Sequence, residues 1–527
     1  MKRRKSFFIF FFLFINFCAY SQTTFQKTFD RSLDDYATSV CQTYDGGYII
    51  AGSTWLGVGD EYIYLIKTDS DGDTIWTKAF GQAGGIETVI QTSKQEYIVG
   101  SGTISYGAGA QDVLLTSVDN NGNISWSKTY GEMNADYAHT VLQTADGGFI
   151  LSGLTKSFGA GEADICLIKT NSTGNTVWTK TYGGADFEIG ESIQQTRDGG
   201  YIITGRTLSY GAGNFDVILI KIDAAGSTLW TKTYGGNDMD IGYFVLETDS
   251  GYMVCGVTKS FGAGLDDVFL IQTDTIGNLI WSKTYGGSSY DGSTCIQKTS
   301  DSGYIVSGYT KSSGAGMRDC YLIKINCNGD SLWTKAYGGS DDEGGYSVNQ
   351  TADGGFIIAG YSFSFGTGSQ DVYLIKTDSL GNSNCVYQYN TNSVVSSPTI
   401  IAAPQSILET SPGLISNFIT PNKLHGATEN ILCISTNEDE TTFRPIQNTA
   451  FEIVPNPAQD KALLQLNAHV NMHRVHVYDL SGKKMEVTLS NYSNDWYEMN
   501  LQQLPQGVYM IRVDDENIRG VARLVKL

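Results

Sequence analysis

Apolar and polar positions alternate in blocks, not with a helical period, along residues 22–384. Each block holds a short segment such as SIQQT from Ser192, an Asp-Gly turn, and a continuous apolar stretch such as GYIITG from Gly200. A second apolar stretch follows, such as DVYLIKTD from Asp371, and then a turn and a Trp-bearing stretch such as WTKTYGG from Trp178. Stretches that are apolar at every position are typical of strands buried on both faces. The pattern predicts four short strands in each block.

The block recurs seven times with a period of about 52 residues. Six tryptophans mark this period: Trp76, Trp126, Trp178, Trp230, Trp281 and Trp333. Four-stranded units repeated at this spacing predict an all-β fold, a seven-bladed β-propeller. A linear solenoid is the alternative, although its repeats are usually shorter and need capping units.

The two ends of the repeat region predict how the ring closes. The seventh repeat stops near Asn382 without a Trp-bearing strand, whereas the segment Phe25–Phe29 (FQKTF) looks like such a strand without its repeat. We expect this segment to complete the last blade, with Thr28 paired near Leu374–Thr377, because closure removes the open sheet edge.

The stretch LIKTNSTGNTVWTKTYGG from Leu167 resembles the tryptophan-docking repeat of quinoprotein propellers. The resemblance implies a propeller in which each Trp packs onto the neighbouring blade. The chain has no adjacent Cys pair, and the cofactor-binding residues of that family are not visible. No quinone cofactor is therefore expected.

Composition changes where the repeats end. All eight prolines lie at or after Pro398, and residues 385–450 are rich in Ser, Thr, Asn and Ile, which predicts a linker or a strand-containing spacer. Cys385 and Cys433 bracket much of it, and spacing alone leaves a disulfide and two free thiols equally open.

Residues 451–527 alternate like strands and carry an ordered set of motifs. These are PNP from Pro455, VYDLSGK from Val477, LPQGVY from Leu504 and the terminal RLVKL from Arg523. Together they resemble the C-terminal sorting domain of type IX secretion cargo from Bacteroidetes-like bacteria. The resemblance implies a small immunoglobulin-like β-sandwich, contact with the type IX secretion machinery, and either anchoring to the surface or release. An ordinary adhesive β-sandwich is the alternative.

The N-terminus has the features of an export signal. A basic run, MKRRK, precedes an apolar segment from Phe7 to Phe17, and small residues favour cleavage between Ser21 and Gln22. Four segments follow: a signal peptide at 1–21, a propeller at 22–384, a linker at 385–450 and a sorting domain at 451–527. No later segment is apolar and long enough to cross a membrane, so we expect a protein secreted or held at the outer cell surface, by way of the periplasm.

Charge and residue inventory narrow the function classes. The formal net charge of -20 excludes nucleic acid as a partner held by bulk electrostatics. His139, the single histidine of the repeats, is expected to be a packed structural residue, and no Gly-x-Ser-x-Gly motif or arginine cluster accompanies it. No catalytic residue, cofactor-binding residue or metal ligand is assigned.

Acidic residues form the one candidate site, at the starts of two strands of each repeat. Strand direction places both sets on the face of the disc that carries the longer loops. The first set is Asp35, Asp136, Glu188, Asp240, Asp291 and Glu343, and the second is Asp112, Asp164, Asp216, Asp267, Asp319 and Asp371. Gly84 and Tyr62 interrupt the two sets. Either each acid caps its own Gly-rich loop, or the acids share a cation such as Ca²⁺.

The sequence therefore predicts an exported, non-catalytic binding or adhesion protein with a glycan or protein ligand. A secreted propeller hydrolase or lyase acting on polysaccharide is the second hypothesis, and a structural surface component is the third.

Overall fold

The computed structural model describes most of residues 22–435 and 451–526. The longest stretches outside the description are 1–21, 419–427, 436–450 and 467–474, so the predicted signal peptide lies outside the described residues. Every described element is a β-strand. Within this part of the chain, no helix is long and apolar enough to span a bilayer.

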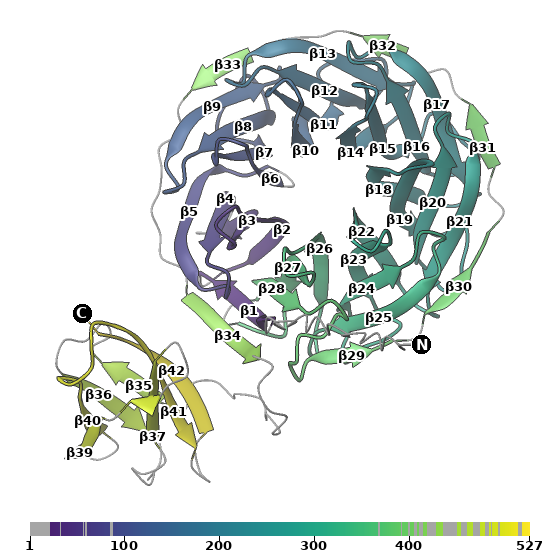
Figure 1. Ribbon diagram of the computed structural model, residues 1–527. Coiled ribbons are helices and arrows are strands. Elements are labelled where there is room, and N and C mark those ends of the chain that lie inside the picture. The colour runs from purple at the N-terminus through teal and green to yellow at the C-terminus, as the bar shows by residue number, and fades with distance from the viewer. Residues whose placement is uncertain are drawn as a thin grey trace, which may run out of the picture.

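Seven antiparallel sheets surround a common axis and form a seven-bladed β-propeller (Figure 1). The strands nearest the axis are β2 (Asp35–Gln42), β6 (Thr88–Gln91), β10 (Asp136–Gln143), β14 (Glu188–Gln195), β18 (Asp240–Glu247), β22 (Asp291–Lys298) and β26 (Glu343–Gln350). Next outward are β3 (Tyr48–Trp55), β7 (Tyr97–Thr103), β11 (Phe149–Thr155), β15 (Tyr201–Thr207), β19 (Gly251–Thr258), β23 (Tyr304–Thr310) and β27 (Phe356–Ser362).

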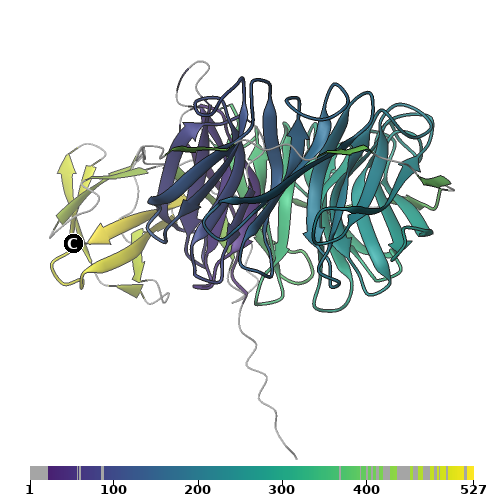
Figure 2. The same cartoon turned by 90° about the horizontal axis from the view of Figure 1, so that it is seen from above.

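The third strands are β4 (Glu61–Thr68), β8 (Asp112–Val118), β12 (Asp164–Thr170), β16 (Asp216–Ile222), β20 (Asp267–Asp274), β24 (Asp319–Ile325) and β28 (Asp371–Thr377). The fourth strands are β5 (Thr74–Gln82), β9 (Ile124–Tyr130), β13 (Thr176–Gly183), β17 (Thr228–Gly235), β21 (Leu279–Gly286), β25 (Ser331–Tyr337) and, in the seventh blade, β1 (Thr24–Asp30). Seen from the side, the strands run between the two faces of a disc (Figure 2).

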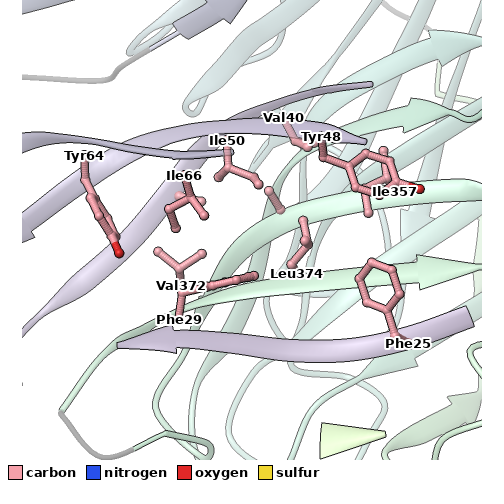
Figure 3. Packing of buried hydrophobic residues seen from close by; sticks show 12 residues of the cluster. Phe25, Phe29, Val40, Tyr48, Ile50, Tyr64, Ile66, Ile357, Val372 and Leu374 are labelled. Atoms are coloured by element: carbon pink, nitrogen blue, oxygen red, sulfur yellow. The ribbon is translucent and has the colours of Figure 1, made fainter. Parts of the chain in front are cut away.

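The ring closes through its own N-terminus, as the sequence predicts. Strand β1 pairs antiparallel with β28, and Thr28 lies opposite Tyr373, one residue before the predicted stretch. Phe25 and Phe29 of β1 point into a cluster that Tyr48 and Ile66 of the first blade share with Leu374 and its neighbours in the seventh (Figure 3). All seven residues of β1 are buried. The hydrophobic core is a ring of such clusters, most of them lying between adjacent blades.

In five of the fourth strands, β9, β13, β17, β21 and β25, a Trp, a Lys and a Tyr join the blade to the next. Trp178 lies against Gly226 in a turn of the following blade, and Tyr182 donates a 2.6 Å hydrogen bond to the Gly226 carbonyl. Gly226 has φ +84°, and a side chain there would also meet the stem of Lys180, so the position favours glycine. The same Tyr-to-Gly bond recurs between Tyr130 and Gly174, Tyr234 and Gly277, Tyr285 and Gly329, and Tyr337 and Gly381. The tryptophans therefore dock onto neighbouring blades, as the quinoprotein resemblance implies.

The segment after the repeats runs around the outside of the ring. Its strands are β29 (Gln388–Asn390), β30 (Val394–Ser396), β31 (Ile401–Pro404), β32 (Leu408–Thr410), β33 (Ile415–Phe418) and β34 (Thr428–Ser435). They add a fifth, antiparallel strand to the sixth, fifth, fourth, third, second and seventh blades, in that order (Figure 1). Strand β34 covers β1, so the N-terminal strand is hydrogen-bonded on both edges. We call β29–β34 the belt.

The C-terminal part forms a β-sandwich with a core of its own. One sheet contains β35 (Phe451–Val454), β36 (Lys461–Leu466), β40 (Trp496–Asn500) and β39 (Thr488–Ser493). The other contains β38 (Lys484–Met485), β37 (Val475–Asp479), β41 (Gly507–Asp514) and β42 (Arg519–Lys526). Leu464, Val477, Met499 and Ile511 are fully buried between these sheets.

Candidate functional site

The twelve acids singled out in the sequence are buried beneath the loops of one face. Six begin the strands nearest the axis and six begin the third strands, and no side chain among them is more than 2% exposed. Glu343 shows their contacts: Oε2 accepts a 2.7 Å hydrogen bond from the Gly339 amide, and Oε1 accepts bonds from Ser362 and Ser364. Asp319 Oδ2 accepts bonds from the amides of Ala315 and Gly316. These contacts match the loop-capping alternative, and a shared cation stays a prediction.

The acids meet in pairs across the junctions between blades. The third-strand acid of one blade interacts electrostatically with the first-strand acid of the next: Asp112 with Asp136, Asp164 with Glu188, Asp216 with Asp240, Asp267 with Asp291, and Asp319 with Glu343. Tyr62 and Gly84, the two exceptions, occupy the corresponding positions of a single junction, that between the first and second blades. This junction therefore lacks both members of the acid pair.

Desolvation sets the protonation of these pairs. Burial raises the pKa of Asp216, Asp267 and Asp319 to about 6, against hydrogen bonds from loop amides. Burial likewise raises the pKa of Asp35 to about 7. Carboxyls with these pKa values keep a proton to a higher pH than an ordinary Asp, and below about pH 6 that proton relieves the repulsion within a pair.

One group of acids among the described residues has a geometry that suits a metal ion. Asp30, Asp35 and Asp371 are buried where the first and last blades meet, and one oxygen from each lies within 4.8 Å of the others. Carboxylate oxygens are the ligands that Ca²⁺ prefers. These residues belong to the predicted sets except for Asp30, which ends β1.

A β-bulge places one extra residue near the axis in six of the innermost strands. The bulges fall at Thr38, His139, Glu191, Tyr243, Thr294 and Tyr346. Bulges bend a strand and re-aim the side chain of the extra residue. Contacts among these residues run between blades, and Figure 1 shows their strands closest to the ring axis. This region is the second candidate site.

Four tyrosines, which we call the tyrosine cluster, converge there from the fifth, sixth and seventh blades. They are Tyr243, Tyr309, Tyr346 and Tyr361, all partly exposed. The rings of Tyr346 and Tyr361 lie 5.6 Å apart, and the pKa of Tyr309 is raised by burial and by Tyr243 and Tyr361. Gly292 and Gly344 of the innermost strands give Tyr309 and Tyr361 room, because a Cβ at either glycine would lie within 2.7 Å of the ring beside it.

A triad of ionisable residues, His139, Glu191 and Arg206, adjoins the tyrosine cluster. His139 Nδ1 donates a 2.6 Å hydrogen bond to Glu191 Oε2, and Arg206 Nη2 lies 3.2 Å from Glu191 Oε1. Burial opposes ionisation of Glu191, but His139 and Arg206 outweigh it and lower the pKa of this carboxyl. The Arg206 guanidinium in turn lies 5.4 Å from the Phe215 ring centre. His139 is therefore a packed, buried residue, in keeping with its predicted structural role.

Arg318 lies at the junction of the sixth and seventh blades, where its backbone forms a β-bridge with Asp342. Its guanidinium carbon lies 4.9 Å from the Tyr309 ring centre, and a hydrogen bond joins it to Tyr361. Sequence reasoning missed this residue and Arg206. Arg206 and Tyr309 follow the glycine of the second strand, where other repeats carry Ser53, Leu154 or Val257. At this position a large or charged residue replaces the smaller residues of those other repeats, and that difference was visible in the sequence.

The comparisons bear on the end of the chain. Residues 452–526 match the family model of the secretion system C-terminal sorting domain. The C-terminal β-sandwich is a type IX secretion sorting domain. The protein is therefore an export product of type IX secretion, delivered to the cell surface or released. The sorting domain is the part that the secretion machinery engages.

Solved structures resemble the chain only distantly, and no curated protein matches it. A Bacteroides caccae protein of unknown function is 11% identical, with 55% of this chain and 93% of that chain covered and a TM-score of 0.33. PorZ, a surface component of the type IX secretion system of Porphyromonas gingivalis, is 10% identical, with 93% and 81% covered and a TM-score of 0.28. The family 43 glycoside hydrolase YxiA of Bacillus licheniformis is 9% identical, with 66% and 98% covered and a TM-score of 0.26. These scores carry no functional argument.

Proposed function

We propose that the mature protein is a non-catalytic carbohydrate-binding protein that acts outside the cell and binds its ligand at the ring axis through the tyrosine cluster. The observation that carries the proposal is the set of partly exposed rings that several blades bring together on one side of the axis. Aromatic side chains offer an apolar face and a polar edge, which suits saccharide rings with their hydroxyl groups.

Burial of the acids favours binding over hydrolysis. Glycoside hydrolysis needs two carboxyl groups that reach the scissile bond. The predicted acids are buried and accept hydrogen bonds from the loops above them. Glu191 is also buried, against His139 and Arg206. The polysaccharide hydrolase or lyase is therefore the second candidate, and a structural component without a small ligand is the third.

A glycan array probed with residues 22–527 tests the proposal. We expect binding to a subset of glycans, lowered at least about tenfold by Tyr346→Ala or Tyr361→Ala, because each substitution removes a ring from the cluster. Tyr44→Ala is the matched control, since Tyr44 is 69% exposed in a turn between the first two strands of its blade, on the opposite face. Shorter products after incubation with a bound glycan would instead establish the enzyme, and an array without binding would leave the structural role.

A further inference from the structure

Arg318 lies beside Tyr309 and Tyr361 of the tyrosine cluster and has no carboxylate in ion-pair contact among the described residues. Arg206 is paired with Glu191, and Arg197 with Asp249 at 2.9 Å. Asp342 of the seventh blade attracts Arg318 electrostatically but forms no such pair with it. Arg318 is partly exposed, so a ligand in solvent can approach this residue.

Aromatic neighbours fix the plane of this guanidinium. Tyr309 lies against it at 4.9 Å, and Tyr361 holds it by a hydrogen bond. Both tyrosines are themselves held over glycines of the innermost strands, Gly292 and Gly344. A guanidinium that is already ordered loses little conformational entropy when it binds a carboxylate or sulfate through two parallel hydrogen bonds.

The fourth blade contains the same pair of residue types in exchanged positions. Arg206 follows the glycine of β15, and Phe215 precedes the acid that begins β16, whereas in the sixth blade these positions hold Tyr309 and Arg318. In the fourth blade the arginine is neutralised by Glu191, but the position in the sixth blade that corresponds to Glu191 is Thr294. The innermost strand of the sixth blade therefore contributes no carboxylate at that position.

We infer that Arg318 is an anion subsite, and that the ligand is an acidic saccharide whose carboxylate or sulfate pairs with Arg318 while its ring lies on the tyrosine cluster. This inference rests on the proposed function and names its ligand class. The chain as a whole is acidic, so bulk electrostatics repels such a ligand. Selection must therefore come from short-range contacts, and the binding should depend weakly on salt.

Paired glycans provide the test: uronate-containing, sialylated and sulfated oligosaccharides, each beside its carboxyl-reduced or desulfated counterpart, with the protein at residues 22–527. We expect the acidic member to bind about tenfold or more tightly, the range that hydrogen bonds to charged groups supply. Arg318→Gln should remove this preference, and Arg318→Lys should restore part of it because charge returns without the planar fork. Arg197→Gln, on an arginine that is 63% exposed in a turn of the opposite face, should change nothing.

Equal binding of both members, or a preference that survives Arg318→Gln in a variant with unchanged thermal unfolding, would overturn the inference. Loss of all glycan binding on Tyr346→Ala together with equal binding of acidic and neutral members would leave the proposed function standing. An array with no binding to any member would remove both.

Discussion

At the scale of single residues, the acid pairs connect burial to pH dependence. Burial raises the pKa of Asp35 to about 7 and that of Asp319 to about 6, whereas an Asp in an unfolded chain titrates near 3.9. The folded state therefore binds these protons more tightly. Their contribution to stability is present below about pH 4 and is lost as pH rises through 6 to 7.

Other acids have the opposite effect at lower pH. Burial opposes the shift at Asp146, but hydrogen bonds from Thr144 and Lys169 prevail and lower the pKa of this carboxyl to about 2, and Asp198 and Asp301 behave alike. Their contribution is present above about pH 4 and is lost as pH falls through 2. Stability should therefore be greatest near pH 4 to 5.

We predict that the Tm of the protein falls between pH 5 and pH 8, and that Asp319→Asn reduces this fall. An amide is uncharged and can donate to Glu343, so the variant should gain on the order of 2 kcal/mol at pH 8 relative to its own change at pH 5. Thermal unfolding at both pH values measures this. A fall of the same size in the variant would show that the pair does not carry the effect.

Thermal unfolding also tells whether the acids share a proton or a metal cation. If the pairs or the Asp30–Asp35–Asp371 group share Ca²⁺, millimolar Ca²⁺ should raise the Tm at pH 8 and release heat on titration. If they share protons, Ca²⁺ should leave the Tm unchanged and its titration should release no heat.

Residue patterns predicted the acids and, as one alternative, their hydrogen bonds to the Gly-rich loops, but not their burial. Counting along the repeat finds both sets, because each acid holds a fixed place in its strand. Burial was not predicted, since it depends on how the Gly-rich loops fold over the acids. Glu191 and Tyr243 were not singled out in the sequence, and His139 was expected only as a packed residue, because a bulge is visible only in the register of two strands.

At the scale of elements, the sevenfold recurrence of the block predicted the number of blades, and the incomplete seventh repeat predicted the closure. The belt was expected only as a linker or a loose strand-containing spacer, without any pairing to the blades. Five of its strands have three or four residues, and each is defined by hydrogen bonds to a distant blade edge. No periodic pattern of apolar positions arises from so short a strand, so its pairing cannot be read from the sequence.

Strand β1 and the belt should contribute differently to the stability of the propeller. Deleting residues 22–30 removes β1, whose residues are all buried, and separates β28 from β34. Ending the chain at residue 384 removes the belt but leaves β1 against β28. We predict a large fall in Tm for the deletion and a smaller one for the truncation, because open edges and lost hydrogen bonds cost less than an exposed core.

Thermal unfolding of both variants beside a chain that ends at Ile446, which keeps the belt, measures these contributions. Equal stability of the deletion and the parent would contradict closure by β1. A truncation at 384 as stable as the chain ending at Ile446 would show that the belt is not a stabilising element.

At the scale of the whole molecule, the propeller and the sorting domain are built as separate hydrophobic cores. Phe25, Leu374 and their neighbours belong to clusters of the ring, whereas Leu464 and Met499 belong to a cluster that contains residues of the sandwich alone. Each part therefore has its own source of stability. The division agrees with a sorting domain that directs secretion and a propeller that functions outside the cell.

This separation predicts that the last 77 residues are needed for delivery and not for folding of the propeller. A chain that ends at Ile446 keeps the blades and the belt but loses β35–β42. Expressed in a host with a type IX secretion system, it should accumulate folded in the periplasm, while the full chain reaches the surface or the medium. Fractionation followed by immunoblotting gives the location, and protease resistance of the periplasmic fraction gives the folded state.

A matched full-length variant with Tyr44→Ala should be delivered normally, because Tyr44 is an exposed turn residue of the first blade. Normal surface delivery of the truncated chain would contradict the role of the sorting domain, and a truncated chain degraded in the periplasm would contradict the independence of the propeller.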